Sequence, residues 1–269
     1  MGRASVSTHG ILNPRAAARR FTLTRVAPSP ALASLVERHW IIRWSLPAGE
    51  SHAQETLPHP CVNLVVEADR CAVHGPATAR HVARLTGSGR VVATKFKPGG
   101  FSPLVDFPVR ALSEGSRALA DAFGLARDEL APAVRAEPDD AAAVALVERF
   151  LEGRARPPDA AVALVIEAAT LALERRDLVT VERLAAAVGV SPRTLQRLFE
   201  RHVGVSPKWM LRRYRVHELA ARVERGEPLR WASLAAELGY CDQSHLIREF
   251  KAQLGRSPTE YAAWCAGRS

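Results

Sequence analysis

The first part of the chain carries short runs of β-prone residues separated by turn signals. The runs FTLTRV, HWIIRWSL, CVNLVVEA and RVVATKFK fall between residues 21 and 97, and PAGE, HGPAT, GSG and KPGG interrupt or follow them. Short strands at such spacing are typical of small sheets and barrels. The pattern therefore predicts a small β-barrel domain with helices over residues 21–125.

From Ala111 onward the apolar positions recur at helical spacing. Asp139 or Asp140 is placed to cap the helix that follows it, and Asp159 precedes a long helical stretch in the same way. Between them RARPPD, residues 154–159, combines charge with two prolines, as interdomain linkers do. We therefore expect a helical connector and linker over residues 126–157 and an all-helical domain over residues 158–269.

Two stretches of the helical part repeat each other. LAAAVG at 184–189 recurs as LAAELG at 234–239, an offset of 50 residues. Six further identities recur at an offset of 51, namely Leu195 and Leu246, Arg197 and Arg248, Phe199 and Phe250, Gly204 and Gly255, Ser206 and Ser257, and Pro207 and Pro258. In each copy a glycine stands where the first helix should end, and a capping residue, Ser191 or Asp242, opens the second.

Each copy therefore has the pattern of a helix-turn-helix unit, with an apolar face and a polar face on its second helix. Such a helix enters the DNA major groove, where Arg suits guanine and Gln suits adenine. The stretch from Ser206 to about Arg225 predicts one capped helix between the copies. Its length of roughly 27 Å approaches the ~34 Å between successive major grooves on one face of DNA. Two-helix turns in protein-binding bundles share this pattern, so a protein-interaction module remains the alternative.

Charge favours a polyanionic partner such as nucleic acid. The net charge is +9, and the segment from Leu178 to the C-terminus holds 15 basic and 9 acidic residues.

The longest apolar stretch, residues 160–173, contains Glu167 and is shorter than the ~20 residues of a membrane helix. The N-terminal residues lack the apolar block of a signal peptide. We therefore expect a cytoplasmic protein with no membrane partner.

Residues 159–264 resemble the AraC/XylS family of bacterial transcription regulators. LGYCDQSHLIREFKAQLGRSPTEY keeps that family's Gly-aromatic pair, its Asp and Ser, its Arg-x-Phe-Lys, and its Gly-x-Ser-Pro-x-x-Tyr ending, although Leu246 stands where Phe is frequent. The resemblance implies two helix-turn-helix units joined by a long helix. It also implies a sequence-specific transcription regulator, expected as an activator, that binds double-stranded promoter DNA.

The resemblance also implies the site residues. Those expected to contact bases are Arg193, Gln196 and Arg197 in the first unit and Gln243, Ser244, His245 and Arg248 in the second. Ile247 stands at the position equivalent to Gln196, so the second helix would meet a thymine methyl there or make no base contact. Candidate phosphate contacts are Arg201, Lys208, Arg212 and Lys251, with solvated helix surface as the alternative reading.

The N-terminal part is similar to a domain common in actinobacterial members of the family. The matching stretches are APSPALASLVERHW, LPHPCVNLVVE, VHGPAT and GRVVATKFKPGG. By analogy with sensor domains elsewhere in the family, residues 21–125 would form a cupin-like β-barrel that binds a small-molecule effector or pairs two subunits. RNA polymerase and a second copy of the chain are therefore further candidate partners.

The same region also holds side chains that could bind a metal. His52, His59, Cys61, Cys71, His74 and His81 crowd one β-rich region. None of them has zinc-finger or zinc-ribbon spacing, so we expect no metal and no cofactor, with a metal- or thiol-based sensor as an alternative. Some alkylation-repair proteins join a helix-turn-helix unit of this family to a zinc site of four cysteines, but residues 1–157 hold only two. With no hydrolase triad order, phosphate loop or HExxH either, we expect no enzyme and assign no catalytic residue.

Overall fold

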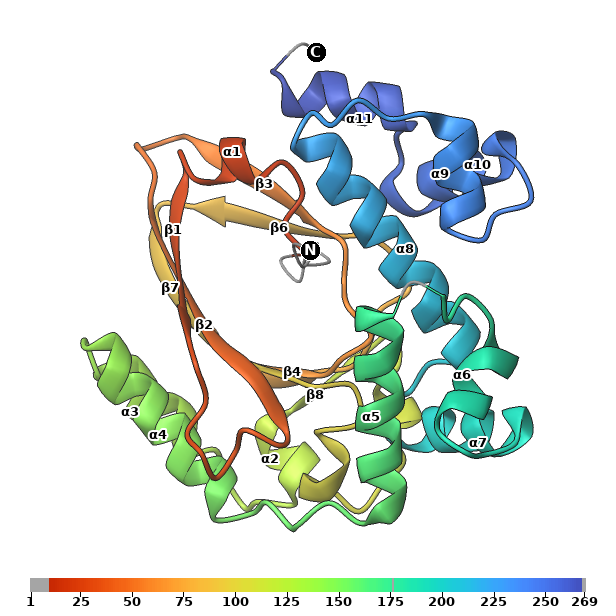
Figure 1. Ribbon diagram of the computed structural model, residues 1–269. Helices are drawn as coiled ribbons and strands as arrows, with labels where there is room; N and C mark the ends of the chain where they lie inside the picture. The colour runs from red at the N-terminus through yellow and green to blue at the C-terminus, as the bar shows by residue number, and fades with distance from the viewer. Residues whose placement is uncertain (1–9, 176, 268–269) are drawn as a thin grey trace.

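A computed structural model describes residues 10–175 and 177–267. A β-rich N-terminal half lies beside a helical C-terminal half, and helices α5 (Ala160–Glu174) and α8 (Pro207–Glu224) run along the boundary between them (Figure 1). The predicted combination of an N-terminal β-rich domain with a C-terminal helical domain is confirmed.

The strands form two antiparallel sheets. Their bounds are β1 Phe21–Val26, β2 Val36–Ser45, β3 Ser51–Thr56, β4 Asn63–Val66, β5 Cys71–His74, β6 His81–Thr86, β7 Ser88–Phe96 and β8 Ser116–Ala118. Six of them pair in the order β1-β2-β7-β4-β5-β8, while β3 pairs with β6 alone. Gly87, with φ +53°, separates β6, which pairs with β3, from β7, which pairs with β2 and β4. Within the described residues β1 and β8 are therefore edges, and the predicted barrel is an open, curved pair of sheets.

One face of the six-stranded sheet packs against three helices. These are α2 (Leu119–Phe123), α3 (Leu130–Ala136) and α4 (Asp140–Glu152). Ile41, Phe96 and Val147 belong to the same buried core, which unites sheet and helices. Asp139 caps α4, as expected, by accepting a hydrogen bond from the amide of Ala142 at 2.8 Å.

Short helices and the predicted linker complete the N-terminal half. The short helices are α1 (Pro14–Ala17), η1 (Ser102–Leu104) and η2 (Val109–Leu112). The linker residue Arg156 donates hydrogen bonds to the carbonyls of Pro103 and Val105 at 3.0 and 2.9 Å. The linker is therefore fastened to the N-terminal half, which its proline-rich composition did not predict.

The C-terminal half contains two helix-turn-helix units. The first is α6 (Val181–Ala187) with α7 (Pro192–His202), and the second is α9 (Trp231–Glu237) with α10 (Gln243–Leu254), followed by α11 (Pro258–Cys265). Each unit has its own core, and α5 contributes to the first. Leu12 and Leu57 from the N-terminal half lie in the core of the second unit. The two halves thus share buried apolar surface, which is stabilising.

Helix α8 joins the units, as the sequence predicted. Ser206 caps it by accepting a hydrogen bond from the amide of Trp209 at 3.2 Å. Twelve of its residues are buried, because it packs against both units and the N-terminal half. An isolated connecting helix would bury only one stripe, so this connector is part of the molecule's core.

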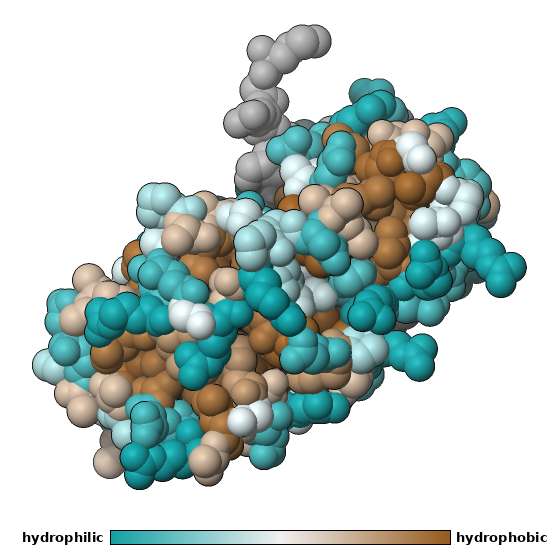
Figure 2. All heavy atoms as spheres, turned by 90° about the horizontal axis from the view of Figure 1, so that it is seen from below, coloured by the Kyte–Doolittle hydropathy of each residue, from teal (hydrophilic) through white to brown (hydrophobic). Residues whose placement is uncertain are grey.

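Few large hydrophobic side chains are strongly exposed among the residues that the structure describes. On the face shown in Figure 2, hydrophobic residues are interrupted by hydrophilic side chains. Among the described residues, Val82 is the one large hydrophobic residue that is strongly exposed. None of the helices over those residues is both long enough and apolar enough to span a bilayer.

Candidate nucleic-acid interface

The second helix of the first unit, α7, presents a polar face to solvent. Gly189 adopts φ +72° and ends the preceding helical segment, and Ser191 then caps α7 through the amide of Thr194 at 3.1 Å. Leu195 and Phe199 are fully buried, and this fixes the rotation of the helix. The three residues predicted to contact bases, Arg193, Gln196 and Arg197, are all exposed on the opposite side.

This face forms part of an open concave surface between α6, α7 and the start of α8. Arg193, Arg197 and Lys208 supply its positive charge, and Glu182 and Glu200 lie on the same surface. Gln196 donates a hydrogen bond to Glu200 at 3.2 Å, so its amide must exchange that partner to contact a base. The surface can bind a polyanion while its carboxylates limit where a phosphate can approach.

The second unit repeats this arrangement on α10. Gly239 adopts φ +70°, and Asp242 caps α10 through the amide of His245 at 2.7 Å. Leu246, Phe250 and Leu254 are fully buried. Gln243, Ser244 and Arg248 are exposed. These three predicted base-facing positions, like those of the first unit, therefore lie on exposed helix surface.

Two residues of α10 are less free than the sequence implied. The ring of His245 packs edge-on against Tyr240, with centroids 5.3 Å apart. Ile247, which replaces Gln196 of the first copy, packs partly against the core of its own unit. The position equivalent to Gln196 is therefore apolar in the second helix, and His245 is only partly exposed.

The candidate phosphate contacts fall into two groups. Arg201, Lys208 and Lys251 are exposed on helix surfaces. Arg212 instead donates two hydrogen bonds to the carboxylate of Glu249, at 2.8 and 3.0 Å. These hydrogen bonds raise the pKa of Arg212 although partial burial opposes the shift. The guanidinium thus links α8 to α10.

Glu249 is a functional candidate that the sequence reasoning missed. Its side chain is only 3% exposed, and Gln253 also donates to it at 3.1 Å. At the repeat offset of 51 it corresponds to Leu198, which is a core residue of the first unit. A carboxylate at an apolar core position requires a basic partner. The alignment of Glu249 with Leu198 could therefore have predicted that Glu249 is buried and paired with a basic residue.

The histidines and cysteines of the N-terminal half do not converge. Within residues 10–175 and 177–267, no three His, Cys, Asp or Glu side chains are grouped as metal ligands would be. Burial raises the pKa of the Cys61 thiol to about 11 and that of Cys71 to about 12. Both thiols are therefore protonated near neutral pH, which makes them weak nucleophiles and weak metal ligands.

Comparisons with known proteins agree with this architecture. Residues 184–263 match the family described as a helix-turn-helix domain. Residues 24–116 match a domain of unknown function, DUF6597. The first match covers part of α6 and all of α7 to α10, and the second covers β2 to β7 with part of β1.

Curated relatives share the C-terminal region. A putative AraC-like transcription regulator of Streptomyces antibioticus is 40% identical over 82 residues, which are 30% of this chain and 27% of that protein. The regulatory protein ada of Salmonella typhimurium (strain LT2) is 30% identical over 152 residues, or 56% of this chain and 38% of that protein. The chain thus spans well under half the length of these relatives.

Among solved structures, ToxT from Vibrio cholerae O395 matches over 93% of this chain and 99% of its own, at 11% identity and a TM-score of 0.39. The matched helix-turn-helix family and the AraC-like relatives agree with the repeat geometry of α6–α7 and α9–α10. The chain therefore combines an N-terminal region that matches DUF6597 with a C-terminal region that matches a helix-turn-helix domain and is similar to AraC-like transcription regulators.

Proposed function

We propose that this chain is a sequence-specific DNA-binding transcription regulator whose helices α7 and α10 enter adjacent major grooves of promoter DNA. The supporting observation is that two matched helix-turn-helix units, held on one connecting helix, both expose the polar face of their second helix. The 18 residues of α8 span roughly 27 Å. That length is compatible with successive major grooves about 34 Å apart on one face of DNA.

Arg193, Gln196 and Arg197 would contact bases in the first groove. Arg can donate two hydrogen bonds to guanine O6 and N7, and Gln pairs with adenine N6 and N7. In the second groove Arg248 is the equivalent of Arg197, with Gln243, Ser244 and His245 beside it. Because Ile247 replaces the first unit's glutamine, the second block of the DNA site should be read less stringently than the first.

Exposed cations around the helices would hold the DNA backbone. Arg201, Lys208 and Lys251 are exposed and would contact phosphates. Such contacts fix the orientation of a protein on DNA without reading its sequence. Arg212 would contribute mainly by fixing α10, because its guanidinium is bound to Glu249.

In this proposal the three segments have different roles. Residues 158–269 bind promoter DNA, residues 21–125 sense a small-molecule effector or pair two copies of the chain, and residues 126–157 connect them. An activator would in addition contact RNA polymerase. The DNA-binding residues carry no catalytic chemistry in this account, and the regulator works by binding alone.

In vitro selection tests the proposal. Random double-stranded DNA would be enriched on the purified full-length chain at physiological salt and sequenced. The proposal predicts two conserved blocks about 10 bp apart, the block beneath α7 being better defined. Enrichment without any sequence preference, or binding that does not depend on salt, would support the protein-interaction alternative instead.

A further inference from the structure

Both repeat copies present the same turn to the N-terminal half of the molecule. The Gly-x-Ser-Pro sequence that follows α7 is Gly204–Pro207, and the one that follows α10 is Gly255–Pro258. Each turn begins directly after a candidate DNA-reading helix ends. A contact at these turns therefore fixes the C-terminal end of that helix and leaves its N-terminal part free for DNA.

The first turn docks against the segment around η2. Ser113 donates a hydrogen bond from its hydroxyl to the carbonyl of Gly204 at 2.6 Å. Gly204 has φ +89°, and a Cβ there would lie 2.8 Å from the hydroxyl oxygen of Ser113 and 3.0 Å from Pro76. Only glycine allows so close an approach in this backbone conformation. The turn is thus held by close packing around Gly204 as well as by the hydrogen bond from Ser113.

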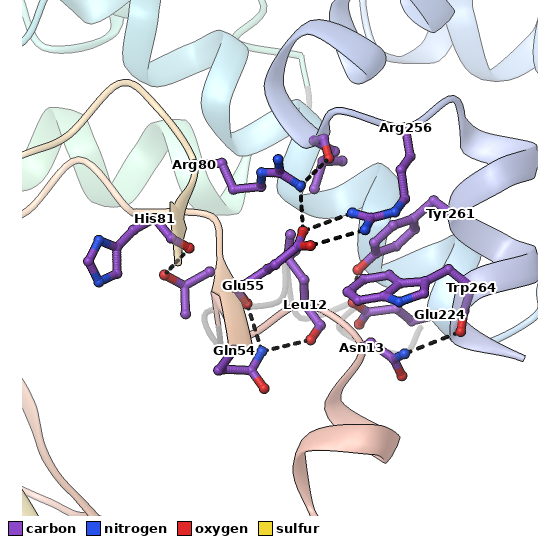
Figure 3. A network of polar contacts seen from close by, with 12 residues as sticks. Leu12, Asn13, Gln54, Glu55, Arg80, His81, Glu224, Arg256, Tyr261 and Trp264 are labelled. Carbon is purple, nitrogen blue, oxygen red and sulfur yellow. Dashed lines mark hydrogen bonds and ion pairs between the residues drawn. The ribbon is translucent and has the colours of Figure 1, made fainter. Parts of the chain in front are cut away.

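The second turn docks against β3 and β6 through an ion-pair cluster (Figure 3). Arg256 donates two hydrogen bonds to the carboxylate of Glu55, at 2.8 and 3.0 Å. Arg80 also pairs with Glu55, and it donates to the carbonyl of Leu254 at 3.4 Å. The side chain of Glu55 is 16% exposed. Burial raises its pKa, but the two arginines outweigh that effect and lower it.

A single short segment connects the two docking points. Residues 76–80 begin at Pro76, beside the first turn, and end at Arg80, beside the second. Between them the carbonyl of Thr78 accepts a hydrogen bond from Arg213 of α8. The segment therefore contacts both turns and the helix that joins the two units.

Glu114, the residue after Ser113, holds this segment by two hydrogen bonds. Glu114 donates its amide to the carbonyl of Pro76 at 3.1 Å and accepts the amide of Thr78 at 2.8 Å. Glu114 adopts φ +60°, a conformation uncommon for a residue other than glycine, which indicates that its surroundings constrain it. The two docking points are therefore connected to each other by hydrogen bonds within the N-terminal half.

We infer that Glu55 and Ser113 are positioning residues for DNA recognition, which set the separation of the two DNA-reading helices and hence the spacing between the two blocks of the DNA site. The inference rests on the proposed function. These residues need not touch DNA. They act by holding the turns after α7 and α10 at fixed places on the same domain. The N-terminal half thus determines block spacing, while α7 and α10 determine the sequence of each block.

The DNA test compares spacings rather than sequences. The full-length chain, Glu55→Gln, Ser113→Ala and the double variant would each bind a library in which the two selected blocks are separated by 8 to 13 bp. Glu50→Gln is the matched control, because the exposed Glu50 pairs with Arg20, within the N-terminal half.

We expect the wild type and the control to prefer one spacing sharply. In the double variant the ratio of affinities between the preferred spacing and the other spacings should fall about tenfold, because a charged and a neutral hydrogen bond at the docking points are missing. The base preferences within each block should stay the same. An unchanged spacing profile would overturn the inference, and so would altered base preferences or tighter binding at every spacing.

A distance measurement separates this inference from the proposed function, since it needs no DNA. Spin labels would be placed on the exposed Cys241 and on Arg201→Cys, in a Cys265→Ser background. We expect one narrow distance in the wild type and a broadened distribution in the Glu55→Gln, Ser113→Ala double variant. A distribution of equal width in both would refute the positioning role even if DNA binding holds. Broadening without any DNA preference in the selection would refute only the proposed function.

Discussion

His59, in the loop before β4, stacks on His217 of α8 with ring centroids 3.9 Å apart and ring planes 9° apart. The stack joins the N-terminal half to the helix that connects the two helix-turn-helix units. The Nε2 atoms of both rings are buried without a hydrogen-bond partner. Burial and the nearby Arg213 and Lys95 hold the pKa of both rings well below the ordinary value, and for His59 the partner ring acts in the same direction, as does Arg38.

The stack predicts that acid weakens the joint between the two halves. A histidine whose pKa is lower in the folded chain than in the unfolded chain takes up a proton on unfolding. Its contribution to stability is therefore complete above about pH 6.5 and is lost as the pH falls below that value. We expect the midpoint of thermal unfolding to decrease between pH 7 and pH 5.

His217→Phe keeps an aromatic ring in the stack but removes one titrating group. The variant should show a shallower decrease with pH than the wild type. Only part of the slope should disappear, because burial also lowers the pKa of His39 and His74. Equal slopes in wild type and His217→Phe would contradict the role given to the stack.

Arg197 and Arg248 occupy equivalent positions in the two copies, so their substitutions form a matched pair. Each Ala variant should weaken binding to the selected site by about 1–3 kcal/mol and relax the preference at one base pair, in its own block only. Binding measured against single-base variants of the site tests this. A uniform loss across all sequences, with a shallower salt dependence, would assign the residue to phosphate contact.

Arg212 is expected to act on stability more than on DNA. Arg212→Ala leaves the buried carboxylate of Glu249 without its main partner, and it should lower the free energy of unfolding by about 1–3 kcal/mol. When Glu249→Leu is added to Arg212→Ala, most of that loss in unfolding free energy should be recovered, because leucine is the residue type of the equivalent Leu198. Urea titration measures both effects. A neutral effect of Arg212→Ala on stability, combined with a loss of about one unit from the salt slope of DNA binding, would instead indicate a phosphate contact.

The glycines that end the first helix of each unit give a comparison of backbone strain with packing. A Cβ at Gly189 would meet nothing within 4 Å, whereas one at Gly239 would lie 3.0 Å from Val179. Both have positive φ, so Gly189→Ala should cost about 1–2 kcal/mol from the backbone alone, and Gly239→Ala should cost more. Thermal unfolding of the two variants measures the order, and equal losses would show that Val179 moves aside.

The helical half followed from sequence because its determinants are local. Caps at Ser191, Ser206 and Asp242, and the glycine that ends the first helix of each unit, act within a few residues of the helices that they delimit. The repeat then indicated which helix faces lie inward. The same alignment places Glu249 opposite Leu198, so even the ion pair of Glu249 left a trace in the sequence.

The remaining features depend on contacts between distant parts of the chain. Glu55 and Arg256 are 201 residues apart, and nothing in the local sequence of either specifies the other. The opening of the predicted barrel likewise follows from strand order, since β3 and β6 pair with each other rather than with the main sheet. Local patterning predicted β1, β2, β4 and β7 but not β3, β5, β6 or β8, and it carried no information on strand order.

Guanine N7 methylation protection on the selected DNA site tests the central claim most directly, because N7 lies in the major groove. With α7 and α10 in adjacent grooves, the full-length chain should protect guanines in two blocks about 10 bp apart on one face of the duplex. Arg197→Ala should remove protection in one block and Arg248→Ala in the other. Protection of a single block, or none in the major groove, would contradict the account.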